Sequence, residues 1–284
     1  MANLARLRLA STDQLAALDG GSEQNVSRSL LALWENGYAE RLLGQVAARI
    51  LYKGSFPLIY GLTRPGAWLL RKNGYDVPRR LLYETDKQRD GGWRFIDHRV
   101  DISEFMVRLE VACRARSDIE LVERSEIVGR APRTKRDRRV RMTAKVRIDG
   151  VNHLLSADPD EFFGLRMPTK DRTNYFMFER DRGEMPVHRR SSKDQTYYAK
   201  KLLTYYEASR AAEHHRELDI PNFRVLTLTT TRDRVEQMIA AQKDMTQGRG
   251  TNLFLFIDDE SFLKSNLIDA PWITGKGNVI GLSD

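Results

Sequence analysis

The stretch Tyr175-Phe176-Met177-Phe178-Glu179-Arg180-Asp181 decides how the second half of the chain is interpreted. Side chains alternate between the two faces of a β-strand, so the two phenylalanines share one face with Arg180. Glu179 and Asp181 share the other face, about 7 Å apart along the strand. The first four residues are apolar on both faces. This pattern predicts a central strand that is covered on both sides and ends in two carboxylates.

A third carboxylate precedes the neighbouring apolar segment. Asp158-Pro159-Asp160 opens the predicted strand 161–165, which brings Asp160 toward the same sheet margin. Carboxylates at such a place need a cation, an arginine or access to water. Oxygen-rich clusters hold Mg²⁺ or Mn²⁺, and these ions can activate water and stabilise charge during phosphoryl transfer. We therefore predict Asp160, Glu179 and Asp181 as metal ligands and catalytic residues.

Lys201 lies on the helix predicted over about 193–216, one turn before Tyr205. From there it could reach the end of the strand and orient water or hold a phosphate, which makes it the fourth candidate catalytic residue. The alternative is a salt bridge between Lys201 and Glu179 or Asp181 that has no chemical role.

The surrounding pattern alternates strands with helices. Strands are predicted at 161–165, 175–179, 223–231 and 253–257, and helices at about 99–116, 193–216 and 232–243. Such alternation predicts an α/β fold with a mixed sheet flanked by helices.

The first 78 residues show the element order of a winged helix-turn-helix. Ser11 can cap a first helix, Gly20-Gly21 breaks it, and Ser22 can cap a second helix over 23–36. Two short β-prone pieces follow, around 38–43 and 58–62. On the second helix, an apolar stripe is predicted to be buried. The stripe consists of Val26, Leu30, Leu33 and Trp34.

Four polar residues lie near the start of that second helix and off its apolar stripe. They are Gln24, Asn25, Ser27 and Arg28. Gln and Asn can pair with adenine, and Arg with guanine or phosphate, so these residues are the predicted base-reading group. The alternative is a small helical subdomain or dimerisation element with a polar face.

Residues 130–147 hold nine lysines and arginines. Arg136, Arg138 and Arg139 are predicted to contact DNA phosphates. The contribution of such contacts to DNA affinity decreases as the salt concentration rises. The alternative is a solvated hairpin or loop. Apolar residues interleaved at Val140, Met142 and Val146 favour an ordered β-ribbon in the second half of the run.

Composition limits the possible classes. The chain has 284 residues and a formal net charge of +8, which favours a polyanionic partner, here double-stranded DNA. A single cysteine, Cys113, excludes an intramolecular disulfide and fits a reducing, cytoplasmic compartment. No run approaches the roughly 18 apolar residues of a membrane span. Nucleotide-binding glycine motifs, zinc-ligand histidine spacing and the serine-hydrolase elbow are all absent from the sequence.

Four segments together resemble the replication-relaxation family of plasmids and other mobile elements. They are Tyr60–Ala67, Asp158–Asp160, Phe176–Gly183 and Lys201–Tyr205. The resemblance implies an N-terminal winged helix followed by a restriction-endonuclease-like domain of the PD-(D/E)xK type. That nuclease pattern makes Asp160 and Glu179 metal ligands. This sequence departs from it at Asp181, where the pattern has lysine, and Lys201 is a substitute from the helix.

The resulting domain prediction is a winged helix-turn-helix at 1–78, a linker at 79–97 and a nuclease-like domain at 98–284. The predicted function is DNA binding in replication, relaxation or transfer of a mobile element, with a second domain that has lost catalysis. The alternatives are an active Mg²⁺-dependent endonuclease or nickase, and a transcriptional repressor. A homodimer and contacts with replication or transfer proteins are the further expected partners.

Overall fold

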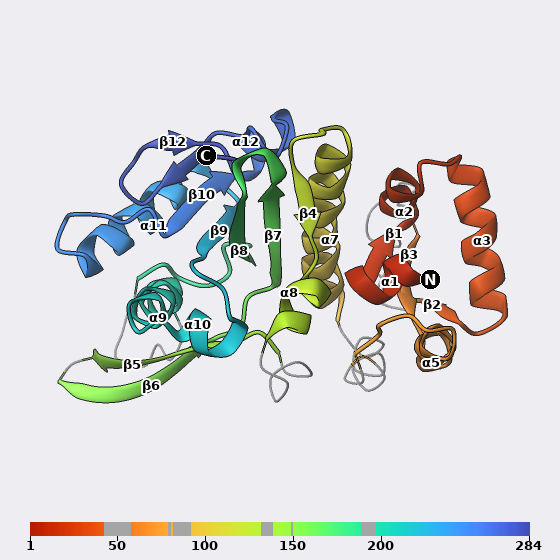
Figure 1. Cartoon of the computed structure of the whole chain (residues 1–284), viewed down its shortest axis with the longest axis horizontal. Coiled ribbons are helices and arrows are strands. Elements are labelled where there is room, and N and C mark those ends of the chain that lie inside the picture. The colour runs from red at the N-terminus through yellow and green to blue at the C-terminus, as the bar shows by residue number, and fades with distance from the viewer. Residues whose placement is uncertain (43–57, 79–80, 82–91, 132–138, 149, 189–196) are drawn as a thin grey trace. The chain divides into compact units, whose positions relative to one another are not determined.

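The computed structural model describes the chain except for residues 43–57, 79–80, 82–91, 132–138, 149 and 189–196. The chain divides into two compact units, Met1–Val111 and Ala112–Asp284 (Figure 1). Helix α7 (Trp93–Arg114) contains the boundary and begins inside the predicted linker. The domain boundaries predicted from the sequence stay predictions.

The N-terminal unit combines helices with a small antiparallel sheet. Its three strands are ordered β1-β3-β2, so β3, which comes last of the three along the chain, lies between the other two. Before α7 the described elements are α1 (Ala2–Leu7), β1 (Leu9–Ser11), α2 (Thr12–Asp19), α3 (Glu23–Glu35), β2 (Ala39–Arg41), β3 (Ile59–Leu62) and α5 (Arg64–Lys72).

Local sequence signals explain how α2 and α3 begin and end. The Ser11 hydroxyl accepts from the backbone N–H of Gln14 at 3.2 Å, and the Gln14 side chain accepts from the Ser11 N–H at 3.0 Å, which forms a capping box. Ser22 caps α3 through a single hydrogen bond, which its hydroxyl accepts from the N–H of Asn25. Gly20, with φ of 68°, takes the left-handed conformation that ends α2. The predicted pair of capped helices is confirmed.

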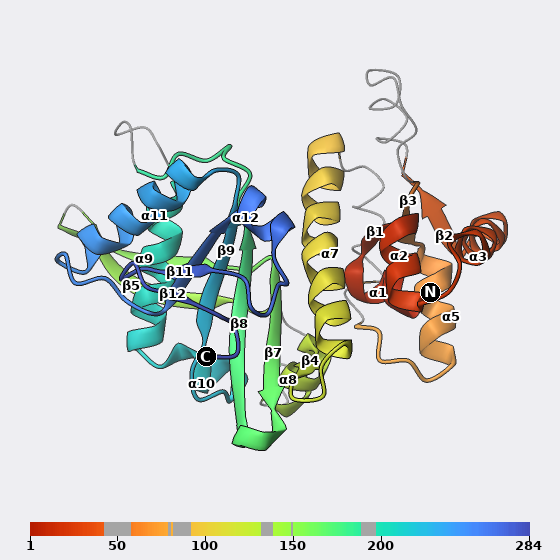
Figure 2. The ribbon, with the colours of Figure 1, turned by 90° about the horizontal axis from the view of Figure 1, so that it is seen from above.

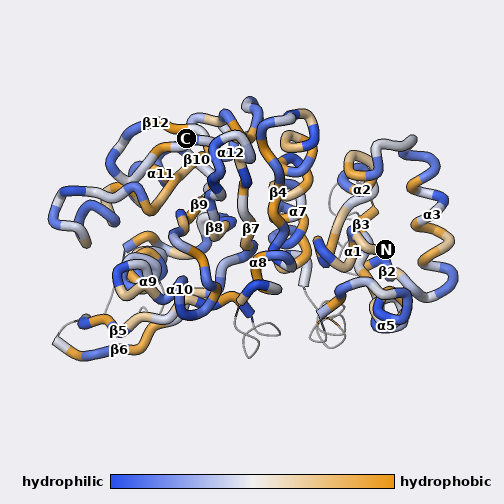
Figure 3. The backbone as a smooth tube through the Cα atoms, in the orientation of Figure 1, coloured by the Kyte–Doolittle hydropathy of each residue, from blue (hydrophilic) through white to orange (hydrophobic). Residues whose placement is uncertain are grey.

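One prediction about α3 is wrong. Figure 3 shows polar residues at both ends of α3 and an apolar segment between them. Val26 and Leu30 are buried as predicted, but Leu33 is only half-buried and Trp34 is 43% exposed. The Arg41 guanidinium lies 4.2 Å from the centre of the Trp34 ring, and its Nε donates to the Tyr60 hydroxyl. Trp34 therefore stacks on a cation at the surface and does not fill the core.

The second unit is built on a seven-stranded mixed sheet ordered β12-β11-β10-β9-β8-β7-β4 (Figures 1 and 2). Strand β8 pairs in parallel with β9, and β9 with β10, whereas the other pairs are antiparallel. The strands are β4 (Glu120–Val122), β7 (Glu161–Met167), β8 (Arg172–Arg180), β9 (Arg224–Thr229), β10 (Phe254–Asp258), β11 (Trp272–Thr274) and β12 (Val279–Ile280). The predicted mixed sheet flanked by helices is confirmed.

The remaining elements of this unit cover the sheet or extend from it. They are α8 (Arg124–Arg130), α9 (Tyr198–Arg210), α10 (Glu213–Leu218), α11 (Arg232–Met245), α12 (Asp259–Lys264) and a hairpin of β5 (Met142–Ile148) and β6 (Val151–Ala157). Helices α9 and α11 pack on the face that carries Tyr175 and Met177, and the two helices share one core with these residues. The opposite face buries Phe176 and Phe178 completely. The predicted doubly covered strand is therefore confirmed.

The helix predicted over about 193–216 is interrupted. Helix α9 ends at Arg210, and α10 starts at Glu213 after Ala212 adopts a left-handed conformation with φ of 52°. None of the described helices combines the length and apolarity that crossing a membrane requires.

Candidate functional site

Glu179 stands at the end of β8 and is almost completely buried, with a side chain 2% exposed. Two groups on α9 bind it from one helix face. Lys201 Nζ donates to Glu179 Oε2, and the Tyr205 hydroxyl donates to Oε1 at 2.6 Å. Positions 201 and 205 are one turn apart, so the helical repeat aims both at the same carboxylate. The salt bridge considered for Lys201 is present.

Asp160 lies beside Glu179 across the strand pair. Glu161 on β7 pairs with Phe178 on β8, which places Asp160 opposite Glu179. Its Oδ2 accepts the backbone N–H of Arg180 at 2.8 Å. Asp160, Glu179 and Lys201 thus come together at one sheet margin, as the sequence predicts.

The electrostatics of this group follow from burial and mutual charge. Burial raises the pKa of Glu179 to about 7; the Lys201 ammonium opposes this increase, and the Asp160 carboxylate adds to it. Burial lowers the pKa of Lys201, but the Glu179 and Asp160 carboxylates outweigh it and leave that pKa above its ordinary value. Lys201 is therefore a firmly protonated cation facing a carboxyl group that titrates near neutrality.

Asp181, just beyond β8, has a different set of partners. Arg234 on α11 donates from Nε to Oδ2 at 2.5 Å and from Nη2 to Oδ1 at 2.8 Å. The Thr229 hydroxyl and the Gly183 N–H also donate to Oδ2. Both carboxylate oxygens are thereby satisfied by a fork-shaped, charge-assisted contact.

The structure therefore separates the predicted acidic cluster into two parts. Among the described residues, no group of three or more His, Cys, Asp and Glu side chains could hold a metal ion. Asp160 and Glu179 lie together beside Lys201, whereas Asp181 is held by Arg234. The expectation of Mg²⁺ or Mn²⁺ stays a prediction, and Asp160 and Glu179 are the pair that could supply oxygen ligands.

Arg234 and Thr229 are site residues that the sequence did not single out. The sequence predicts helix 232–243, but no periodicity or motif indicates that its third residue turns toward Asp181. Tyr198 on α9 was also not assigned a role. Its hydroxyl hydrogen-bonds Thr227 on β9 at 2.7 Å, and burial raises its pKa well above the ordinary value, which keeps this phenol neutral.

The predicted DNA-binding residues lie in both units. Gln24, Asn25 and Arg28 are exposed on the first turns of α3, and Ser27 is half-buried. Arg139 is exposed just before β5. Arg136 and Arg138 lie outside the described residues.

Comparison with known proteins agrees with the resemblance. The two units define a mixed α/β protein with a charged group at the margin of its sheet, and the replication-relaxation family matches residues 1–216. The chain belongs to this family, which suggests a role in replication or relaxation of a plasmid or other mobile element. No curated protein matches the chain, and no solved structure matches it either.

The pKa of Glu179 predicts how stability depends on pH. Its value of about 7 in the folded protein exceeds the ordinary 4.5, so its stabilising contribution is complete below about pH 4.5 and is lost as pH rises through 7. Urea unfolding between pH 5 and 8 should show the wild type losing about 2–3 kcal/mol relative to Glu179→Gln. Glu236→Gln, at an exposed position, should follow the wild type. Parallel stability profiles for wild type and Glu179→Gln would contradict this assignment.

The contact between Arg234 and Asp181 predicts a second effect on stability. Arg234→Met leaves the Asp181 carboxylate buried without its counter-charge and should lower the free energy of unfolding by about 3–5 kcal/mol. Arg232→Met on the same helix, at a side chain 58% exposed, should change it by less than about 0.5 kcal/mol. Adding Asp181→Asn to Arg234→Met should recover part of the loss. Equal effects of the two arginine variants would show that the buried pair is not the cause.

Proposed function

We propose that the chain is a double-stranded DNA-binding protein that acts in replication, relaxation or transfer of a mobile element. In this proposal the N-terminal unit is a winged helix-turn-helix and α3 is its recognition helix. The supporting observation is the arrangement of α3, which buries Val26 and Leu30 and leaves Gln24, Asn25 and Arg28 exposed at its N-terminal end. In helix-turn-helix proteins, residues at this end of the second helix meet base edges in the major groove.

The rest of the unit is compatible with that role. Helices α2 and α3 form an adjacent pair joined by the Gly20-Gly21 turn, and a three-stranded antiparallel sheet supports them. Arg41 on β2 stacks on Trp34 at the C-terminal end of α3. The contact with Arg41 holds the C-terminal end of α3 in place, and the proposed base-reading residues lie at its other end. It therefore helps to fix how α3 is oriented in the unit.

For the second unit we propose a PD-(D/E)xK-like domain that has lost DNA cleavage. It would add DNA affinity, a dimer interface or contacts with replication proteins. Asp181 occupies the position where the nuclease pattern has lysine, and Arg234 neutralises it. Both oxygens of Glu179 accept hydrogen bonds from α9. These contacts give the acidic residues a structural role that needs no metal.

The first part of this proposal predicts that Arg28→Ala weakens specific DNA binding by about 1–3 kcal/mol, because a base contact is lost. The measurement is a fluorescence anisotropy titration with a duplex selected from a random library by the wild type. Lys72→Ala removes an equal charge from the exposed surface of α5 in the same unit, where Lys72 lies over the Trp68 ring, and should leave affinity within about twofold. An unchanged affinity of Arg28→Ala would show that α3 is misassigned as the recognition helix.

A second candidate function is metal-dependent DNA cleavage. The observation that favours it is the meeting of Asp160, Glu179 and Lys201, which are the residue types of the nuclease pattern. Asp160 and Glu179 would hold Mg²⁺ or Mn²⁺, and the metal would supply an activated water and charge stabilisation. Lys201 would have to leave Glu179 free to bind the metal and would then neutralise charge near the phosphate.

Supercoiled plasmid separates these two functions. If the second unit has lost cleavage, plasmid incubated with the protein and Mg²⁺ or Mn²⁺ should remain supercoiled, because Glu179 stays bound to Lys201 and Tyr205. Gel electrophoresis is the measurement. Nicking by the wild type that disappears in both Asp160→Asn and Glu179→Gln, with folding verified by circular dichroism, would establish the second candidate instead.

A further inference from the structure

The hairpin of β5 and β6 is an ordered two-stranded ribbon held by α9. Its strands pair over seven positions, from Met142 opposite Ala157 to Ile148 opposite Val151. One side of the ribbon is buried in the core that includes α9, except near the turn, where Val151 and His153 are exposed. The buried side chains are Met142, Ala144, Val146, Leu155 and Ala157. The sequence predicts an ordered ribbon here, and that prediction is confirmed.

The opposite side of the ribbon faces solvent and is basic. We call it the ribbon face, and it consists of Lys145, Arg147, Asn152, Leu154 and Ser156. All five are exposed, and Leu154 is 74% exposed. The register sets Lys145 opposite Leu154, and Arg147 opposite Asn152. Lys145 and Arg147 are therefore about 7 Å apart on one strand. Thr143 continues this side toward the base of the ribbon, where its hydroxyl donates to Glu213.

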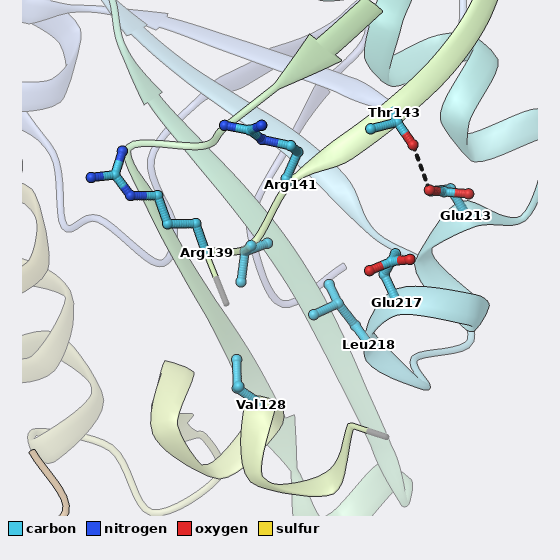
Figure 4. A pocket seen from close by; sticks show the side chains of 8 residues that line it. Val128, Arg139, Arg141, Thr143, Glu213, Glu217 and Leu218 are labelled. Atoms are coloured by element: carbon cyan, nitrogen blue, oxygen red, sulfur yellow. Dashed lines mark hydrogen bonds between the residues drawn. The ribbon is translucent and has the colours of Figure 1, made fainter. Parts of the chain in front are cut away.

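Two of the acidic groups at the base of the ribbon, Glu213 and Asp158, are engaged by neighbours. A hollow of about 420 Å³ lies at this place. Figure 4 shows side chains that line it, with Thr143 donating to Glu213. Glu213 also forms an ion pair with Arg216. Asp158 is bound by two nitrogens of Arg141, and this contact lowers the pKa of Asp158. The positive charge of the ribbon face is thus not cancelled by these two carboxylates.

We propose that the ribbon face docks onto duplex DNA. The DNA major groove admits a two-stranded β-ribbon, and lysine and arginine contact the phosphates on its walls. Asn152 and Ser156 supply hydrogen-bonding groups for base edges, and Leu154 supplies an apolar surface of the kind that contacts thymine methyl groups. This inference rests on the proposed DNA-binding function but assigns a contact surface in the second unit, separate from α3.

The test uses the full chain and a 30-base-pair duplex of random sequence. Binding is measured by fluorescence anisotropy over a series of NaCl concentrations. The double variant Lys145→Ala/Arg147→Ala should reduce the magnitude of the slope of log affinity against log salt by about 1.8, because two phosphate contacts are lost. Affinity at 0.1 M NaCl should fall by roughly 60-fold if affinity extrapolated to 1 M NaCl is unchanged.

The matched control is Arg232→Ala/Lys264→Ala, which removes one arginine and one lysine from exposed positions on α11 and α12. It should keep the wild-type slope, and circular dichroism should show that both double variants retain the fold. A slope for Lys145→Ala/Arg147→Ala equal to that of the wild type overturns the proposal. So does an equal decrease in the control, since this would report only net charge.

A further pair of variants tests the position of the face. Leu154→Glu introduces a negative charge opposite Lys145 at an exposed site, and it should weaken binding more than Leu154→Ser does. Equal DNA affinities of these two variants would contradict contact between the ribbon face and DNA.

The comparison with Arg28→Ala separates this inference from the proposed function. If only Arg28→Ala loses affinity, the assignment of the ribbon face is contradicted and that of α3 is supported. If only the ribbon variant loses affinity, α3 is not the DNA-reading helix and the ribbon face is supported. A wild type that binds no duplex even in dilute buffer overturns both.

Discussion

The contact of α9 with Glu179 is the constraint on which the arrangement of the second unit depends. A carboxyl group that is 2% exposed at the end of a central strand must be neutralised or hydrogen-bonded. Lys201 and Tyr205 do both, and they lie on the helix face that packs on the sheet. The polar contact therefore fixes the position of α9 along β8. Because α9 also carries the β5–β6 ribbon, the position of that ribbon depends on the same contact.

The two carboxylates at the end of β8 show how the same residue type acquires different roles. Glu179 meets one cation and one phenol, and burial raises its pKa toward neutrality. Asp181, two residues later, accepts hydrogen bonds from two guanidinium nitrogens of Arg234. It also accepts from the Thr229 hydroxyl and the Gly183 N–H. The first can change its protonation state within the physiological range of pH. The second fixes the segment after β8 to α11.

The sequence predicted the regular parts of this protein well. Alternation along residues 175–181 placed Glu179 on one face and Phe178 on the other, because a strand of period two offers few other solutions. Serine caps and glycine stops located α2 and α3 for equally local reasons.

Contacts that depend on tertiary geometry were less predictable from the sequence. Arg234 lies 53 positions from Asp181, and nothing local marks it as the partner. Trp34 matched the apolar stripe of α3 but stacks on Arg41, a contact set by β2 and not by the helix. Ala212 breaks the helix after α9 with a left-handed conformation that its residue type does not signal.

The contact of Asp181 with Arg234 also limits how this fold can change over evolutionary time. A single replacement of Asp181 by a cationic residue would set two positive charges against each other at a buried position. An intermediate with only one of the two positions changed would be penalised in either order. Positions 181 and 234 should therefore be inherited as a pair of opposite charges.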